Sequence, residues 1–65
     1  MEKVKQWLEV TGTSVVDFAK LIKVSRQSVH NYLTGESVPG LLVVRRMHDV
    51  TRIPLDDLVP KDNAA

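Results

Sequence analysis

A chain of 65 residues is long enough for one domain, and without cysteine it can form neither a disulfide framework nor a thiolate metal site. Hydrophobic residues make up 43% of it, charged residues 26%, and the net charge is only +1, which is typical of a globular fold and not of a strongly basic nucleic-acid coat. No apolar run approaches the roughly 20 residues of a membrane span, and the N-terminus lacks a signal peptide. We expect no metal, cofactor, small-molecule ligand or membrane partner.

The chain begins with an amphipathic helix. Val4, Trp7 and Leu8 recur at helical spacing within residues 2–10, with lysine and glutamate opposite them. Gly12 suits the left-handed position that ends such a helix.

A second helix is predicted from Ser14, as its N-cap, to about Ile22. Asp17 stands three residues after Ser14, at the position of a capping-box acid. The expected inward side chains are Val15, Phe18, Ala19 and Ile22.

Only Lys23 and Val24 separate this helix from a third one, which Ser25 caps and Gly35 ends. So short a connection is a turn and not a loop. The expected inward side chains are Val29, Tyr32 and Leu33, and the outward polar ones are Arg26, Gln27, Ser28, His30 and Asn31.

Two further helices complete the prediction. Pro39 can open a helix over about 40–50, and Pro54 opens a short one over 54–58. The first of these places Leu41, Val44, Met47 and His48 at core spacing, with His48 as a half-buried packing residue. We predict an all-α, compact bundle of five short helices, with one domain over residues 1–60 and a flexible tail over 61–65.

Four segments and one proline fall, without a gap, at the spacing of a known family: GTSVVDFA at 12–19, VSRQSV at 24–29, YLTG at 32–35, Pro39, and IPLDDL at 53–58. Over nearly its whole length, the chain resembles the phage repressor and Cro-like helix-turn-helix domains, the lambda repressor-like fold. The resemblance implies a five-helix bundle that binds operator DNA as a dimer, with the third helix in the major groove.

The chain departs from the family pattern in several places. Lys23 stands where a glycine usually takes positive φ, which costs roughly 1 kcal/mol. Val15 replaces a common glutamine that reaches a phosphate. Leu8 and Leu33 replace an arginine and a glutamate that often pair, so we predict an apolar contact between them, without the desolvation cost of a buried ion pair.

Base reading is expected from the outward side of the third helix, because such helices enter the groove N-terminus first. Arg26 can clamp O6 and N7 of guanine, and Gln27 can do the same to N6 and N7 of adenine. Asn31 lies one turn after Gln27, and Ser28 and His30 flank this face. The alternative for Arg26, Gln27 and His30 is a solvated helix surface, and the alternative for Ser28 and His30 is a contact with phosphate instead of a base.

Phosphate contacts are expected from helix N-termini and nearby donors, since backbone amides at a helix start bind anions without a basic side chain. A protein of near-neutral charge could hold DNA in this way. The candidates are Ser14, Val15, Lys23, Ser25, Tyr32 and Thr34; the alternative for Tyr32 is a core aromatic with its hydroxyl at the rim.

A homodimer is expected, because one domain covers only half of a two-fold operator. Leu41 to Val44 are all apolar and cannot all face one core, so some must remain outside. The candidate interface is Leu42, Val43, Leu55, Val59 and Pro60; the alternative is that one of them lies under the C-terminal tail.

The function these features favour is sequence-specific double-stranded DNA binding by a small transcriptional regulator in the cytoplasm of a bacterial host. With no evident effector domain, the chain is closer to a Cro-type phage or plasmid repressor than to a larger repressor. An activator or a fragment of a longer protein remains open. No nucleophile elbow, acid pair or glycine-rich phosphate loop favours an enzyme. The main alternative is a protein-interaction module on the same fold, such as an antitoxin or adaptor.

Overall fold

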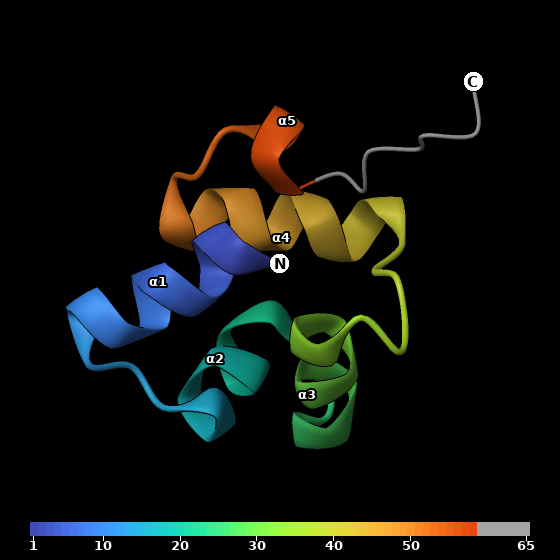
Figure 1. Cartoon of the computed structure of the whole chain (residues 1–65). Helices are drawn as coiled ribbons and strands as arrows, with labels where there is room; N and C mark the ends of the chain where they lie inside the picture. The colour runs from blue at the N-terminus through green and yellow to red at the C-terminus, as the bar shows by residue number, and fades with distance from the viewer. Residues whose placement is uncertain (59–65) are drawn as a thin grey trace.

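The structure is a computed structural model that describes residues 1–58 (Figure 1). Five helices and no strand occur in this part of the chain: α1 (Glu2–Thr11), α2 (Val15–Ile22), α3 (Arg26–Thr34), α4 (Leu41–Thr51) and α5 (Leu55–Leu58). The all-α bundle predicted from sequence is therefore confirmed. The expected domain end at residue 60 and the tail over 61–65 lie outside the described residues.

The helices pack around one core to which each of them contributes. α2 contacts both α3 and α4, while α1 contacts α3 and α5 (Figure 1). Phe18 is fully buried at the centre, and the Trp7 ring packs on it at a tilt, with 5.8 Å between ring centroids. The buried hydrophobic residues are Val4, Leu8, Phe18, Ala19, Ile22, Val29, Val44, Met47 and Leu58.

Most of the predicted core is confirmed, with one clear error. Leu41 was expected to face inward, but its side chain is 82% exposed. It is the first residue of α4, and side chains of a helix lean toward the helix N-terminus, so this one extends past the end of the core. Pro39 is buried and stands two residues before the helix, whose N-cap is Gly40.

The apolar replacement of the family's polar bridge agrees with the packing. α1 contacts α3, and Leu33 packs against the core cluster to which Leu8 belongs. A direct contact between these two side chains stays a prediction.

Polar groups fix the connection between α4 and α5. The Nδ1 atom of His48 lies 2.7 Å from the carbonyl oxygen of Ile53, and the amide of Ile53 donates to Thr51 Oγ1 at 3.2 Å. His48 is half-buried, as its spacing predicted. Arg52 follows α4 in the left-handed region at φ 63°, which the sequence analysis did not foresee.

Candidate nucleic-acid interface

A tight turn sets the angle between α2 and α3. Lys23 takes the left-handed conformation (φ 61°, ψ 44°), as expected for the position where the family uses glycine. The amides of Lys23 and Val24 donate to the carbonyls of Lys20 (3.3 Å) and Ala19 (3.0 Å), the pair of hydrogen bonds that closes a helix C-terminus around a left-handed residue. The next residue, Ser25, is already the N-cap of α3.

The two helices of this pair start in the same way. Ser14 and Ser25 both have extended backbones, and each side-chain oxygen accepts the amide three residues later, Asp17 and Ser28 respectively, at 3.1 Å. Since the first amides of a helix have no intrahelical acceptor, these caps leave the first two amides of each helix available for an anion. Both predicted caps are confirmed.

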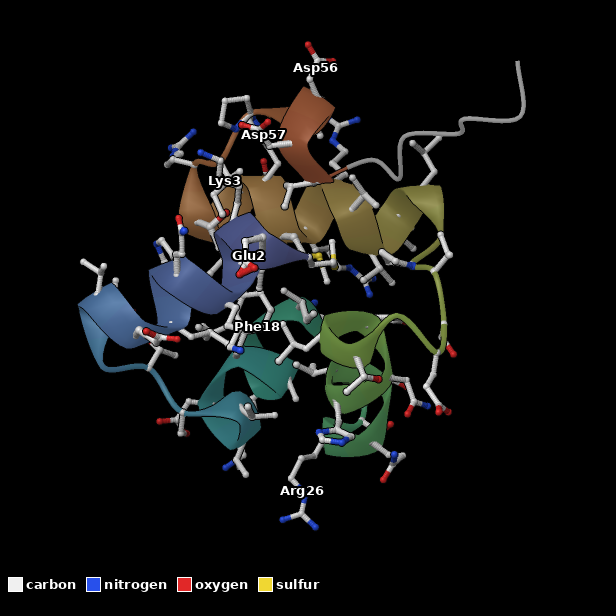
Figure 2. All side chains as sticks on the ribbon, in the orientation of Figure 1. Glu2, Lys3, Phe18, Arg26, Asp56 and Asp57 are labelled. Carbon is white, nitrogen blue, oxygen red and sulfur yellow. The ribbon has the colours of Figure 1, made fainter. Side chains whose placement is uncertain are left out.

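α3 presents polar side chains to solvent. Val29 is its only buried residue, whereas Arg26, Gln27 and His30 are exposed. The Arg26 side chain points away from the bundle, at the end of the molecule opposite to Asp56 on α5 (Figure 2). A cationic side chain and an acidic helix therefore lie on opposite sides of a nearly neutral protein.

Two of the predicted base-reading residues are joined. Gln27 Nε2 donates to Asn31 Oδ1 at 3.0 Å, along one turn of the exposed side of α3. The sequence placed both on one face, but the bond itself is a finding of the structure. It holds two amide groups in a fixed mutual orientation.

Three other residues of α3 that the sequence assigned to DNA contacts interact with the protein itself. The hydroxyl of Ser28 lies 2.9 Å from that of Ser25, and Thr34 Oγ1 donates to the carbonyl of Asn31 at 3.3 Å. Tyr32 is half-buried and packs against the core, which agrees with the core-aromatic alternative.

A hollow that the sequence analysis missed lies between the start of α2 and the outward side of α3. It has a volume of about 320 Å³ and is lined by Val15, Arg26, Gln27 and His30. The available signal was Val15, an apolar side chain at a position where the family often has glutamine. The exposed Lys23 lies in the turn between the same two helices.

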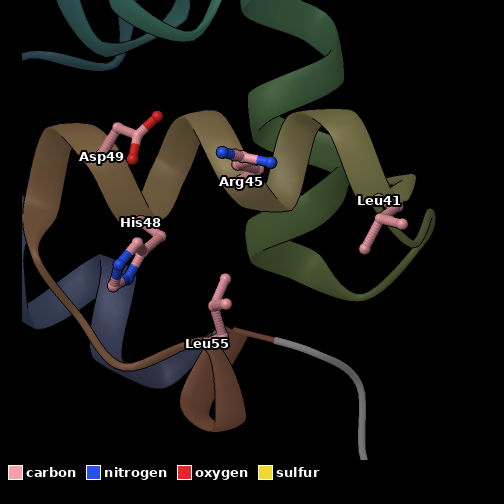
Figure 3. A pocket seen from close by; sticks show the side chains of 5 residues that line it. All are labelled: Leu41, Arg45, His48, Asp49 and Leu55. Carbon is pink, nitrogen blue, oxygen red and sulfur yellow. The ribbon is translucent and has the colours of Figure 1, made fainter.

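A second hollow, of about 420 Å³, lies between α4 and α5 and is lined by Leu41, Arg45, His48, Asp49 and Leu55 (Figure 3). Of the residues predicted for a dimer interface, Leu42 is 62% and Leu55 45% exposed, and Val43 is half-buried against the core. The other two, Val59 and Pro60, lie outside the described residues.

Residues 1–58 contain no group of three or more histidine, aspartate or glutamate side chains that could hold a metal ion. Among these residues no helix has the length and apolar character needed to cross a membrane.

Fold and site together define a five-helix domain with a helix-turn-helix whose second helix presents polar side chains to solvent. The helix-turn-helix family model matches residues 4–58, a stretch that takes in most of α1 and all of the other helices. The chain belongs to the helix-turn-helix family, a family of DNA-binding regulators whose members are typically not enzymes. No curated protein and no solved structure matches it.

Proposed function

We propose that this protein is a small transcriptional regulator of Cro type, from a phage or plasmid, that represses by binding a specific double-stranded operator as a homodimer. The observation that carries the proposal is the exposed polar side of α3, with Arg26 directed away from the bundle (Figure 2). An α-helix fits the major groove of B-DNA, where each base pair presents a distinct pattern of donors and acceptors. Such a function implies action in the cytoplasm of a bacterial host.

Base reading is assigned to the first two turns of α3. Arg26 donates two hydrogen bonds to a guanine, and Gln27, oriented by Asn31, contacts an adenine. His30 is exposed beside them, and Ser28 completes the proposed set at its margin.

Phosphate contacts are assigned around the starts of α2 and α3. The amides at Ser14 and Val15, at the start of α2, are assigned to one phosphate group, and Ser25 marks the equivalent position of α3. Lys23 adds the one cation of the turn. Thr34 and the hydroxyl of Tyr32 are the remaining proposed donors.

The proposed dimer uses the surface of α4 and α5. Leu42 and Leu55 supply exposed apolar area, Leu41 adds to it, and Val43 lies beneath. Val59 and Pro60 remain part of the proposal from the sequence. A two-fold pair of domains reads two half-sites, which gives the specificity that one domain lacks.

The test is a binding experiment at moderate salt with a randomised pool of duplex DNA, from which the bound sequences are selected and then titrated singly. We expect one preferred, two-fold sequence. Arg26→Ala should reduce the preference for it over random DNA by roughly 5- to 150-fold, the value of one bidentate base contact. Lys5→Ala, an exposed cation on α1, is the matched control and should keep the preference.

Two outcomes would contradict the proposal. If Arg26→Ala kept the full preference, the assignment of that residue would be wrong. If the protein bound no DNA from the pool, the alternative of a protein-interaction module, such as an antitoxin or adaptor, would take its place.

A further inference from the structure

We infer that the hollow between α2 and α3 is a subsite for the 5-methyl group of a thymine, with Val15 as the residue that selects it. This inference rests on the proposed function and adds a base contact that comes from α2 and not from α3. It assigns a role to a residue that departs from the family pattern.

The position of the hollow follows from the two helix starts. Val15 is the first residue of α2, and the other lining residues, Arg26, Gln27 and His30, lie on the outward side of the first two turns of α3. Whatever base edge Arg26 and Gln27 approach must therefore pass next to this hollow.

The chemistry of the lining distinguishes Val15 from its neighbours. The three residues from α3 carry hydrogen-bonding heads, while the half-buried Val15 offers only hydrocarbon. A polar base edge against it would lose water without gaining a hydrogen bond. The methyl group of thymine is the apolar feature that base pairs present in the major groove, so it is the group that gains from this contact.

The side-chain amide of Gln27 also favours an A·T base pair. Gln27 is suited to adenine, and adenine is paired with thymine, whose methyl group lies in the same groove. Gln27 and Val15, adjacent in one hollow, thus favour A·T pairs from two sides. Together the two residues select a base step that contains an A·T pair.

The experiment is a methyl scan on the operator selected from the random pool. Each thymine is replaced in turn by deoxyuridine, which lacks the methyl group and keeps all hydrogen bonds. At one symmetry-related position in each half-site, we expect the replacement to weaken binding about fourfold, the value of one buried methyl group. Replacement at the other thymines should have a smaller effect.

Two variants connect the effect to the hollow. Val15→Ser removes both methyl groups of the side chain and leaves a polar hydroxyl, and it should bind the thymine and uracil operators equally well. Val10→Ser makes the same change at an exposed side chain of α1 that does not line the hollow, and should keep the fourfold preference. Circular dichroism checks that both variants are folded. If a variant does not fold, the methyl scan with the unchanged protein still tests the inference.

Three results would overturn the inference. The first is an unchanged protein that binds every uracil operator as tightly as the thymine operator. The second is a Val15→Ser variant that keeps the methyl preference, and the third is a Val10→Ser variant that loses it. In each case the protein still selects an operator, so the proposed function stands; failure to bind any DNA would instead reject that function.

Discussion

The guanidinium of Arg46 donates from Nη1 to the carbonyl oxygen of Ile22, across 3.4 Å and from α4 to the last residue of α2. The last carbonyls of a helix have no intrahelical donor, and a positive charge is favourable there. The Arg46 side chain is half-buried. The bond fastens α4 directly beside the turn that orients α3.

Replacing this arginine should therefore weaken the fold. Arg46→Met keeps most of the apolar stem but loses the donor, and we expect the free energy of unfolding to fall by about 1 kcal/mol. For a domain of this size, that corresponds to a melting temperature lower by roughly 4–8 °C. Arg45→Met, at the exposed neighbour, is the matched control and should stay within about 0.5 kcal/mol. Equal melting temperatures for the two variants would show that the bond contributes nothing.

Lys23 has a left-handed backbone and is also a proposed phosphate contact. Its replacement should therefore change the stability of the protein and its affinity for DNA in opposite directions. Lys23→Gly removes the steric cost at φ 61° and should raise the free energy of unfolding by about 1 kcal/mol. The same change removes a proposed phosphate contact, so affinity should fall equally for all DNA sequences. Arg52→Gly, at φ 63° after α4, should raise stability without affecting binding. Urea denaturation and DNA titration measure the two quantities, and unchanged binding by Lys23→Gly would remove this residue from the interface.

The hydrogen bond between Gln27 and Asn31 predicts non-additive effects on operator binding. If each amide orients the other, Gln27→Ala and Asn31→Ala each disrupt the pair. The double variant should then lose less than the sum of the two, by at least about 0.5 kcal/mol. A cycle that combines Lys23→Ala with Asn31→Ala serves as the control and should be closer to additive. Simple addition in the first cycle would mean that the two residues act independently.

An acid in the first turn of α2 should oppose phosphate binding. Asp17 is exposed near the proposed anion site, so Asp17→Asn should raise affinity for any duplex by about two- to fivefold at low salt. The gain should shrink as salt increases, because ions screen an exposed charge. Asp56→Asn makes the same change on α5, at the end of the molecule opposite to Arg26, and should leave binding unaltered (Figure 2). Equal effects from both would indicate that only net charge matters.

The exposed leucine at the start of α4 tests the dimer. Leu41→Lys alters a side chain that is 82% exposed, so the fold should persist, while association through the α4 and α5 surface should weaken. We expect at least tenfold weaker binding to a two-fold operator and little change for an isolated half-site. Val10→Lys, at a similarly exposed residue on α1, is the control. Analytical ultracentrifugation of the unchanged protein, with and without operator DNA, gives the result that could refute the dimer. A strict monomer under both conditions would do so.

Local signals were enough to predict the framework of the protein. The caps Ser14 and Ser25 and the terminators Gly12 and Gly35 each act through bonds and backbone angles within a few residues, and all four are found where the sequence placed them. Helical spacing identified the core for the same reason, since it reports which side of a helix is apolar.

The errors and omissions depend on distant parts of the chain. The bond of Arg46 joins residues 24 apart in sequence, and the hollow beside Val15 exists only because the starts of α2 and α3 meet in space. Leu41 has the right spacing for the core but lies beyond its end, which spacing does not reveal. The packing of the helices against one another decides where the core ends. The spacing of apolar residues along a single helix does not reveal that end.

α3 holds Val29 in the interior and packs Tyr32 and Leu33 against the core. Its exposed positions are Arg26, Gln27, His30 and Thr34. Substitutions there can redirect the domain to a new target without any repacking. A lineage carrying this fold could thus diverge in the promoters it controls while its thermodynamic stability stays nearly constant.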